Sequence, residues 1–330
     1  MNKRRKIVLA LGASVLVSPL ASFAQQPGKI WRIGYLDSGS QQSLVDSGRH
    51  AALIVGLREH GYIEGKNFVL EARFANGKAD LLDGMAAELV RQNVDLIVST
   101  GTPACKAAQR ATTTIPIVVT VTGDPVIDGL AVSLARPGGN ITGMSSGIDD
   151  TVKKLVELLG VAVPKMKRVA AITNPANTTH TSMLSSIQAA AKQTGTQVMP
   201  VSVRTPDEIE RGFEAMVRQH IDAVVIVPDV FLLQQLTQIA GLATKHRLPS
   251  IYGEANYAEA GGLIGYGADR RDNFRRAGIF VDKILKGAKP AELPFEQPTR
   301  YYMTINRKTA TALGLTIPQR LLISADKVIE

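Results

Sequence analysis

The feature that most constrains this chain is a regular alternation of two kinds of segment. Short runs rich in β-branched residues alternate with longer amphipathic runs, an order typical of parallel sheets covered by helices. The strand-like runs form two series: residues 31–37, 68–74, 95–99 and 116–122, and then 168–173, 197–203, 223–227 and 249–252. Helix-like runs between them include residues 80–92 and 206–219, the second opening with the capping residues Thr205, Pro206 and Glu208. The sequence therefore predicts an α/β fold.

Parts of the first series recur in the second series in the same order. Residues 90–98 (VRQNVDLIV) return as residues 217–225 (VRQHIDAVV), at the end of one predicted helix and the start of the next strand. Two further pairs correspond: 32–35 with 168–171, and 111–116 with 243–249. A single match could arise at any helix–strand junction of a parallel α/β protein, but three matches in one order favour a duplication. We therefore expect two similar Rossmann-like lobes with parallel sheets.

Clusters of turn residues and glycines indicate where the chain passes between the two halves. They lie at residues 135–147 and 261–267, and an extended linker follows at 290–298. Three such crossings would form a three-stranded hinge, which bends without separating the lobes. The predicted lobes are each made of two segments: residues 30–143 plus 267–298 for the N-terminal lobe, and 144–266 plus 299–330 for the C-terminal lobe.

The first two dozen residues, 1–24, have the layout of a secretory signal peptide. Residues 3–6 are basic, residues 7–21 are almost wholly apolar, and small residues precede a cleavage site near Ala24. A membrane anchor is the alternative, but Pro19 interrupts the apolar run well short of the roughly 20 residues that span a bilayer. We expect export to a bacterial periplasm, and the pair Arg4-Arg5 leaves both the Sec and the twin-arginine route open.

Charge and cysteine content limit the classes of partner. The net charge is +9, and the leader supplies four bases and no acid, which leaves +5 spread over the rest of the chain. Because no Lys/Arg run is interleaved with aromatic residues, we expect no nucleic-acid partner. The lone Cys105 cannot form an internal disulfide.

Motifs for cofactors and for metal ligation are missing from the sequence. It contains no phosphate-binding loop and no His/Cys/Asp cluster with the spacing of metal ligands. The five histidines are dispersed, and most fall in or beside predicted helices, where we expect them to be solvated: His50, His60, His180, His220 and His246. We therefore predict no catalytic residue, no metal and no cofactor.

Candidate ligand-binding residues follow the strands. In open parallel sheets ligands bind beyond the carboxyl ends of the strands, where helix N-termini present unpaired N–H groups. Hydroxyls and glycines after the first series suit a carboxylate, and acids from both halves suit an ammonium group, so the set would fit a zwitterion between the lobes. The candidates are Ser38, Ser40, Gly101, Thr102, Thr122, Asp124, Asn174, Asn177, Asp229, Tyr252 and Glu254. The alternative for the Ser, Thr, Asp and Asn residues among them is helix capping.

The order of several short motifs resembles the ABC-transporter substrate-binding proteins related to the tryptophan/tyrosine-binding type. The motifs are RIGYLDSG (32–39), GYIEGKN (61–67), GTPA (101–104), ATTTIP (111–116), GDP (123–125), ARPGGNITG (135–143), NPAN (174–177), KHRLP (245–249) and LGLTIP (313–318). The resemblance implies a type I periplasmic-binding-protein fold that closes on a small solute, often an amino acid or an aromatic compound. It also implies a membrane ABC permease as partner. We expect a monomer, and the identity of the solute does not follow from the motifs.

Two other functions stay open from the sequence alone. A periplasmic sensory module would use the same closing lobes, and a periplasmic α/β enzyme would need a catalytic constellation or a cofactor motif. A transcriptional repressor of the same architecture would need a helix-turn-helix where the predicted leader lies.

Overall fold

The computed structural model describes residues 29–146 and 148–330, and residues Trp31–Glu330 form one compact unit. The signal peptide predicted at residues 1–24 lies outside the described residues. None of the described helices combines the length and the apolar character that a membrane crossing requires.

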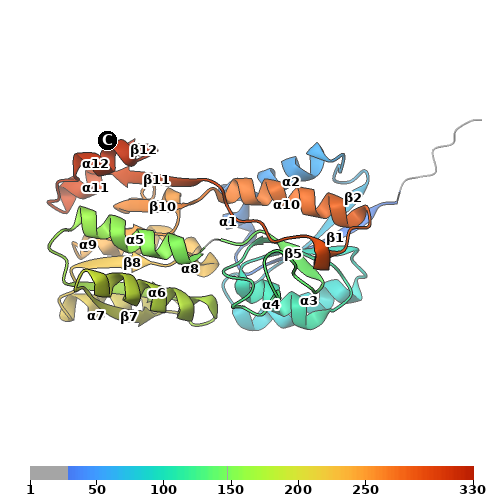
Figure 1. The fold of residues 1–330 in the computed structure, drawn as a ribbon, viewed down its shortest axis with the longest axis horizontal. Helices are drawn as coiled ribbons and strands as arrows, with labels where there is room; N and C mark the ends of the chain where they lie inside the picture. Colours follow the sequence, from blue (N-terminus) through green and yellow to red (C-terminus); the bar gives the residue numbers. More distant parts are fainter. Residues whose placement is uncertain (1–28, 147) are drawn as a thin grey trace, which may run out of the picture. The chain divides into compact units, whose positions relative to one another are not determined.

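Two sheets organise this unit, each lying between layers of helices (Figure 1). In the described residues the first sheet has five parallel strands, in the spatial order β2 (Phe68–Phe74), β1 (Trp31–Asp37), β3 (Leu96–Thr100), β4 (Ile117–Val121) and β5 (Ile141–Gly143). The second has seven strands there, in the order β12 (Lys327–Ile329), β11 (Tyr301–Asn306), β10 (Ile264–Ala268), β9 (Ser250–Tyr252), β8 (Ala223–Ile226), β6 (Arg168–Thr173) and β7 (Gln197–Ser202). Every neighbouring pair is parallel except β10 and β11. The predicted α/β class is confirmed.

The first five strands of the two sheets follow the same spatial order. Strands β6 and β7 take the places of β1 and β2, and β8, β9 and β10 take those of β3, β4 and β5. The repeated sequence motif makes the same contact in both halves. Asp95 accepts a hydrogen bond from the Arg32 amide at 2.8 Å, and Asp222 accepts one from the Arg168 amide at 2.9 Å. The prediction of two similar lobes is therefore confirmed.

The alternation of side chains along β1 divides the N-terminal lobe into two packed layers. Its helices are α1 (Gln41–Asp46), α2 (Arg49–Glu59), α3 (Leu82–Arg91), α4 (Thr102–Ala111) and α10 (Arg270–Leu285). Ile33 and Tyr35 pack against α2 and α10, whereas Leu36 packs on the opposite face with α3 and α4. Helices α2 and α10 cross very closely, because a Cβ added at Gly56 would lie 2.0 Å from the Arg275 carbonyl oxygen.

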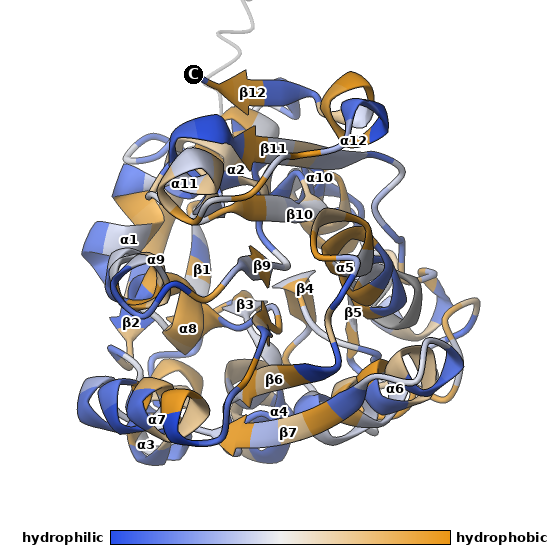
Figure 2. Ribbon diagram, turned by 90° about the vertical axis from the view of Figure 1, so that its left-hand side faces the viewer, coloured by the Kyte–Doolittle hydropathy of each residue, from blue (hydrophilic) through white to orange (hydrophobic). Residues whose placement is uncertain are grey.

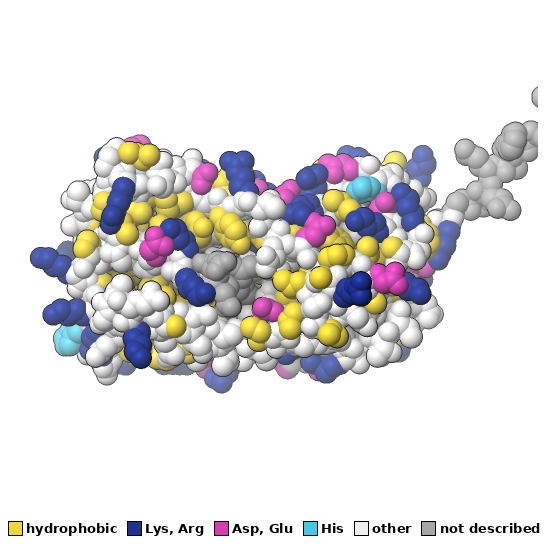
Figure 3. Space-filling view, viewed as in Figure 1, with side chains coloured by type: hydrophobic (Ala, Val, Ile, Leu, Met, Phe, Trp, Pro, Cys, Tyr) yellow, Lys and Arg dark blue, Asp and Glu magenta, His cyan; other side chains and the backbone are white. Residues whose placement is uncertain are grey.

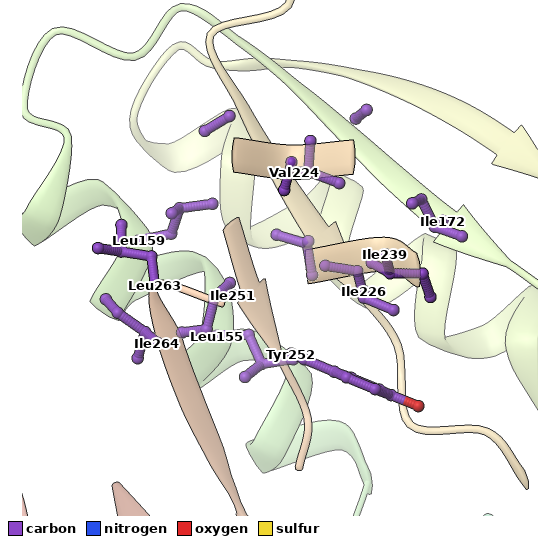
Figure 4. Packing of buried hydrophobic residues seen from close by; sticks show 14 of the residues in the cluster. Leu155, Leu159, Ile172, Val224, Ile226, Ile239, Ile251, Tyr252, Leu263 and Ile264 are labelled. Atoms are coloured by element: carbon purple, nitrogen blue, oxygen red, sulfur yellow. The ribbon is translucent and has the colours of Figure 1, made fainter. Parts of the chain in front are cut away.

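An apolar core on both faces of the second sheet holds the C-terminal lobe together. Its helices are α5 (Ile148–Ala162), α6 (Thr179–Gln193), α7 (Pro206–Arg218), α8 (Val230–Gln234), α9 (Leu236–Lys245), α11 (Arg307–Ala312) and α12 (Gln319–Ser324). In Figure 2 the apolar strands of this lobe lie between helices whose apolar faces turn inward. Val224 and Ile251 are fully buried and pack in one cluster with Leu155, Leu159 and Ile239 (Figure 4). Burial of each such side chain stabilises the fold by about 1.5–3 kcal/mol.

The start of α7 shows how local sequence chemistry sets the beginning of a helix. Thr205 accepts a hydrogen bond from the Glu208 amide at 3.3 Å, and Pro206 occupies the first helical position. The Glu208 carboxylate accepts from the Arg204 amide at 2.6 Å, one residue before the position that a capping box uses. The predicted cap is present, with its return bond shifted by one residue.

Within the described residues the chain passes between the lobes three times. It does so between β5 and α5, between β10 and α10, and between the short 3-10 helix η3 (Pro290–Glu292) and β11. The passages are tied to one another. The Ser145 amide donates to the Glu296 carbonyl oxygen at 2.9 Å, and the Tyr301 hydroxyl donates to the Ser146 carbonyl oxygen at 3.3 Å. The residue-level lobe boundaries stay a prediction.

Candidate ligand cleft between the lobes

Residues that follow strands of both sheets line three small recesses. The first is lined by Ser38, Gly77, Gly101 and Pro103 from the N-terminal lobe and by Asn174, Asn177, Asp229 and Phe231 from the C-terminal lobe. The second lies beside the crossings and is lined by Val121, Ser146, Thr151, Pro228, Glu254, Arg270 and Tyr301, among others. The third contains residues of each, including Gly101 from the first and Ser146 from the second. The three recesses therefore lie next to one another between the lobes, at the position where parallel sheets bind ligands.

A buried group of hydroxyls and one carboxylate lies beneath the N-terminal edge of this cleft. The Tyr35 hydroxyl donates to Asp37 Oδ2 at 2.7 Å and lies 3.1 Å from Thr100 Oγ1. Asp37 Oδ1 accepts from the Gly39 amide at 2.7 Å, which fixes the loop after β1. Burial raises the pKa of Asp37, and the positive charge of Arg49 opposes that rise. The loop is thus held by bonds within its own lobe.

Asp229 is the centre of the C-terminal edge, and protein groups already satisfy its carboxylate. Oδ1 accepts from the amides of Phe231 and Leu232 at 2.9 and 3.1 Å and from Asn174 Nδ2 at 3.2 Å. Oδ2 accepts from Asn177 Nδ2 at 3.0 Å. With these four donors, the buried carboxylate is satisfied without an ammonium partner. Asp229 therefore joins the loops after β6 and β8 and caps α8.

His180 joins the same two loops and is 3 % exposed, so the expectation that it is solvated is wrong. Its Nδ1 accepts from the Asn174 amide at 2.8 Å, which places the ring proton on Nε2. Nε2 lies 3.3 Å from the Pro228 carbonyl oxygen and 3.7 Å from Asp229 Oδ2. Burial lowers the pKa of His180, so the ring is neutral at pH 7. The neutral imidazole of His180 thus holds together the loops after β6 and β8 at the C-terminal edge of the cleft.

Buried charges lie on the side of the cleft near the crossings. Glu254, which follows β9, forms an ion pair with Arg270 at the start of α10. Burial raises the pKa of Glu254, while Arg270 and Arg49 oppose the rise. Arg49 is 3 % exposed and donates to Ser47 Oγ at 2.6 Å and to the Ser43 carbonyl oxygen at 3.2 Å. Its Nη1 has no hydrogen-bond partner among the described residues.

The two lobes approach each other closely across the cleft. A Cβ added at Gly123 would lie 2.2 Å from Thr179 Cγ2, and one added at Gly101 would lie 2.9 Å from Val230 Cγ2. Gly101 also has a φ of +87°, a backbone conformation that favours glycine. The lobes are therefore in a closed arrangement, with glycines on the N-terminal edge where side chains of the C-terminal lobe project.

Most of the residues predicted from the sequence come together at the cleft. Those that line a recess are Ser38, Gly101, Thr102, Thr122, Asn174, Asn177, Asp229 and Glu254. Ser40 and Asp124 line none of the three recesses. Ser40 accepts from the Ser43 amide at 3.1 Å and caps α1, and Asp124 accepts from the Val126 amide at 2.8 Å. Ser40 thus makes the helix-capping bond that was the alternative to ligand contact, whereas Asp124 bonds within the turn of its own loop.

Tyr252 also lies outside the recesses. It is fully buried in the core of the C-terminal lobe, where its hydroxyl extends beyond the aliphatic cluster (Figure 4) and donates to the Asp229 carbonyl oxygen at 3.2 Å. Ligand contact stays a prediction for all eleven candidates. The three acids among them (Asp124, Asp229 and Glu254) are each bonded to protein groups.

Sequence reasoning missed several buried polar residues around the cleft, among them Arg49, Asp128 and His180. Asp128 belongs to the loop after β4 and accepts hydrogen bonds from Thr178 and Thr179 of the other lobe. Its one sequence signal was the second acid of the segment GDPVID, which by itself is compatible with an exposed turn.

The described residues contain neither an assembled metal site nor an exposed cysteine. Within residues 29–146 and 148–330, no group of three or more His, Cys, Asp and Glu side chains is placed to hold a metal ion. Cys105 is fully buried, and burial raises the pKa of its thiol to about 12. On the face shown in Figure 3, Lys and Arg side chains lie scattered over both lobes.

Two similar α/β lobes, three crossings and a cleft lined by strand ends of both lobes define the class of type I periplasmic binding proteins. The chain belongs to the family of ABC transporter substrate binding proteins, which it matches over residues 46–329. The resemblance read from the sequence motifs is therefore confirmed.

Individual relatives agree with this assignment. A tyrosine-binding protein of Clostridioides difficile is 28 % identical over 99 % of this chain and 96 % of its own length. The crystal structure of an ABC domain from Streptococcus pneumonia in complex with L-Trp has a TM-score of 0.84 at 27 % identity, covering 91 % of this chain and 99 % of that one. The ligand-free, open structure of a substrate-binding protein from Clostridium difficile has a TM-score of 0.65 at 25 % identity, covering 91 % and 99 %. The two sequence identities are similar, but the TM-score is higher for the L-Trp complex than for the open protein. This is expected because the two lobes of the present structure are in contact.

Proposed function

We propose that this protein is the periplasmic solute-binding component of an ABC importer and that it captures an amino acid with an aromatic side chain between its lobes. The observation that carries the proposal is the set of adjoining recesses, which are lined by strand-end residues of both lobes. Family membership, the tyrosine-binding relative and the L-Trp complex support the choice of solute. The proposal includes a signal peptide cleaved near Ala24, the predicted lobe boundaries and a monomeric state.

The cleft offers groups for each part of such a solute. The N-terminal amides of α4 and the Ser38 hydroxyl suit a carboxylate. Phe231 in the first recess and Tyr301 in the second supply aromatic surface for a ring. Because Asp229 is already saturated, we propose that carbonyl and amide oxygens receive the ammonium group.

Capture requires that the solute bind the closed arrangement better than the open one. A ligand shifts a conformational equilibrium only through its differential affinity for the two states. A solute that touches both Ser38 and Phe231 makes its full set of contacts only when the lobes meet, and closure then excludes water from it. The lobes thus act on the solute by binding and enclosure.

Thermal unfolding in the presence of candidate solutes tests this function. L-tyrosine, L-tryptophan and L-phenylalanine should raise the midpoint by several degrees, since a ligand at 100 times its Kd stabilises the native state by about 2.7 kcal/mol. D-enantiomers and alanine are the controls and should shift it much less. A panel of amino acids and aromatic carboxylates that leaves the midpoint unchanged would contradict the proposal.

A further inference from the structure

One carboxylate of the N-terminal lobe is bonded to two hydroxyls of the C-terminal lobe. Asp128 Oδ1 accepts from the Thr178 hydroxyl at 3.0 Å, and Oδ2 accepts from the Thr179 hydroxyl at 2.6 Å. Asp128 is 4 % exposed and Thr179 is fully buried, so water is largely kept away from the bond between these two residues. Neither Asp128 nor Thr178 lines one of the three recesses, whereas Thr102, whose hydroxyl lies 3.4 Å from Asp128 Oδ2, lines the third.

The contact belongs to a wider group of hydrogen-bonding side chains. Thr179 gives its one proton to Asp128, and its Oγ1 lies 3.1 Å from Thr102 Oγ1. Thr102 Oγ1 accepts from the Gly123 amide at 3.1 Å and lies 3.0 Å from Thr122 Oγ1 and 3.4 Å from Asp128 Oδ2. The group therefore joins both lobes, and hydrogen bonds connected in this way polarise and strengthen one another.

The end of α6 adds a second favourable interaction. Thr178 is the N-cap residue of this 15-residue helix, but its side chain caps no helix amide, and its hydroxyl donates to Asp128. The carboxylate of Asp128 therefore lies at the N-terminus of α6, where the helix dipole favours a negative charge. Opening the lobes removes both the hydrogen bonds and this interaction.

We propose that Asp128, Thr178 and Thr179 form an interlobe latch that sets the fraction of protein whose lobes are closed before any ligand binds. The role of closure in solute capture rests on the proposed function. The effect of the latch on closure is independent of that function. The latch lies outside the recesses, so weakening it lowers the affinity for every solute by the same factor, chiefly through faster release. A residue that touches the solute would instead change the affinities for different solutes unequally.

The test measures opening without ligand, by fluorescence energy transfer between dyes on the two lobes. Cysteines at the exposed positions Lys66 and Lys192 carry the dyes, and the buried thiol of Cys105 stays unlabelled. The variants are Thr178→Val and Asp128→Asn. Loss of a hydrogen bond to a charged group shifts an equilibrium by about tenfold, so the ratio of open to closed protein should rise by about that factor.

Thr181→Val is the matched control, because Thr181 is exposed in the same turn of α6 and its side chain forms no hydrogen bond with the described residues of the other lobe. It should leave the distribution of the wild type unchanged. Because Thr178 is exposed, its valine variant tests the latch even where Asp128→Asn fails to fold. Overlapping distributions for the wild type and Thr178→Val would overturn the latch, as would equal opening in Thr181→Val. Opening in Thr178→Val together with no response to any amino acid would support the latch and contradict the solute assignment.

Discussion

The two edges of the cleft are built in different ways, although the lobes share one strand order. The N-terminal edge presents glycines, such as Gly101 and Gly123, above a buried group of hydroxyls. The C-terminal edge projects Val230 and Thr179, and its loops are joined by the saturated carboxylate of Asp229. The difference indicates a recessed platform on one side and a rigid projecting edge on the other. Two lobes with one strand order can thus present complementary surfaces when their strand-end residues differ.

The largest effect is expected from breaking the C-terminal edge with Asp229→Ala. This change leaves the side chains of Asn174 and Asn177 and two helix amides without their buried acceptor. Removal of one partner from such a network destabilises a protein by about 3 kcal/mol. The thermal midpoint should fall by several degrees, as measured by circular dichroism.

Asp124→Ala provides the contrast on the N-terminal side. Asp124 caps only its own partly exposed loop, so its loss should cost about 1 kcal/mol. Equal losses in the two variants would show that the C-terminal edge is no more rigid than the loops opposite it.

A smaller effect on stability and a large one on binding are expected from Gly123→Ala on the N-terminal edge. The new methyl group would meet Thr179, whose buried side chain cannot move aside, so the closed arrangement is disfavoured. Overpacking of this kind costs about 1–3 kcal/mol, which corresponds to at least a fivefold loss of affinity for a solute that needs closure. Isothermal titration with L-tyrosine or L-tryptophan measures the change.

Gly160→Ala is the control for this substitution. Gly160 lies within α5 with open space around its Cβ position, and alanine there should stabilise the helix by up to about 1 kcal/mol without changing the affinity. Wild-type affinity in Gly123→Ala would mean that the glycines are not needed for the approach of the lobes.

The smallest effect is expected from pH, through His180 on the C-terminal edge. Burial lowers its pKa in the folded state, so below pH 6.5 the unfolded chain binds a proton that the folded protein does not. Stability should therefore be retained above pH 6.5 and fall as the pH falls from there towards the folded-state pKa. Thermal midpoints of the wild type and of His180→Asn between pH 5 and pH 8 measure the contribution, and the acid-side slope should be shallower in the variant. Parallel curves would contradict this role.

The sequence allowed prediction of the cleft but not of what holds it closed. Gly101 and Asn177 could be found because they follow strands, and the carboxyl ends of parallel strands meet at one edge whatever the details of packing. The latch could not be predicted, because Asp128 and Thr178 are 50 residues apart and meet only where the two lobes come into contact. His180 was misjudged for a related reason, because its burial depends on the loop after β8, 48 residues away.

The central claim is that two lobes close on a small solute. Small-angle scattering of the purified protein, with and without whichever of L-tyrosine and L-tryptophan raises its thermal midpoint, tests this claim most directly. The account predicts a smaller radius of gyration when the amino acid is bound. An unchanged scattering curve at a saturating concentration of that amino acid would contradict it.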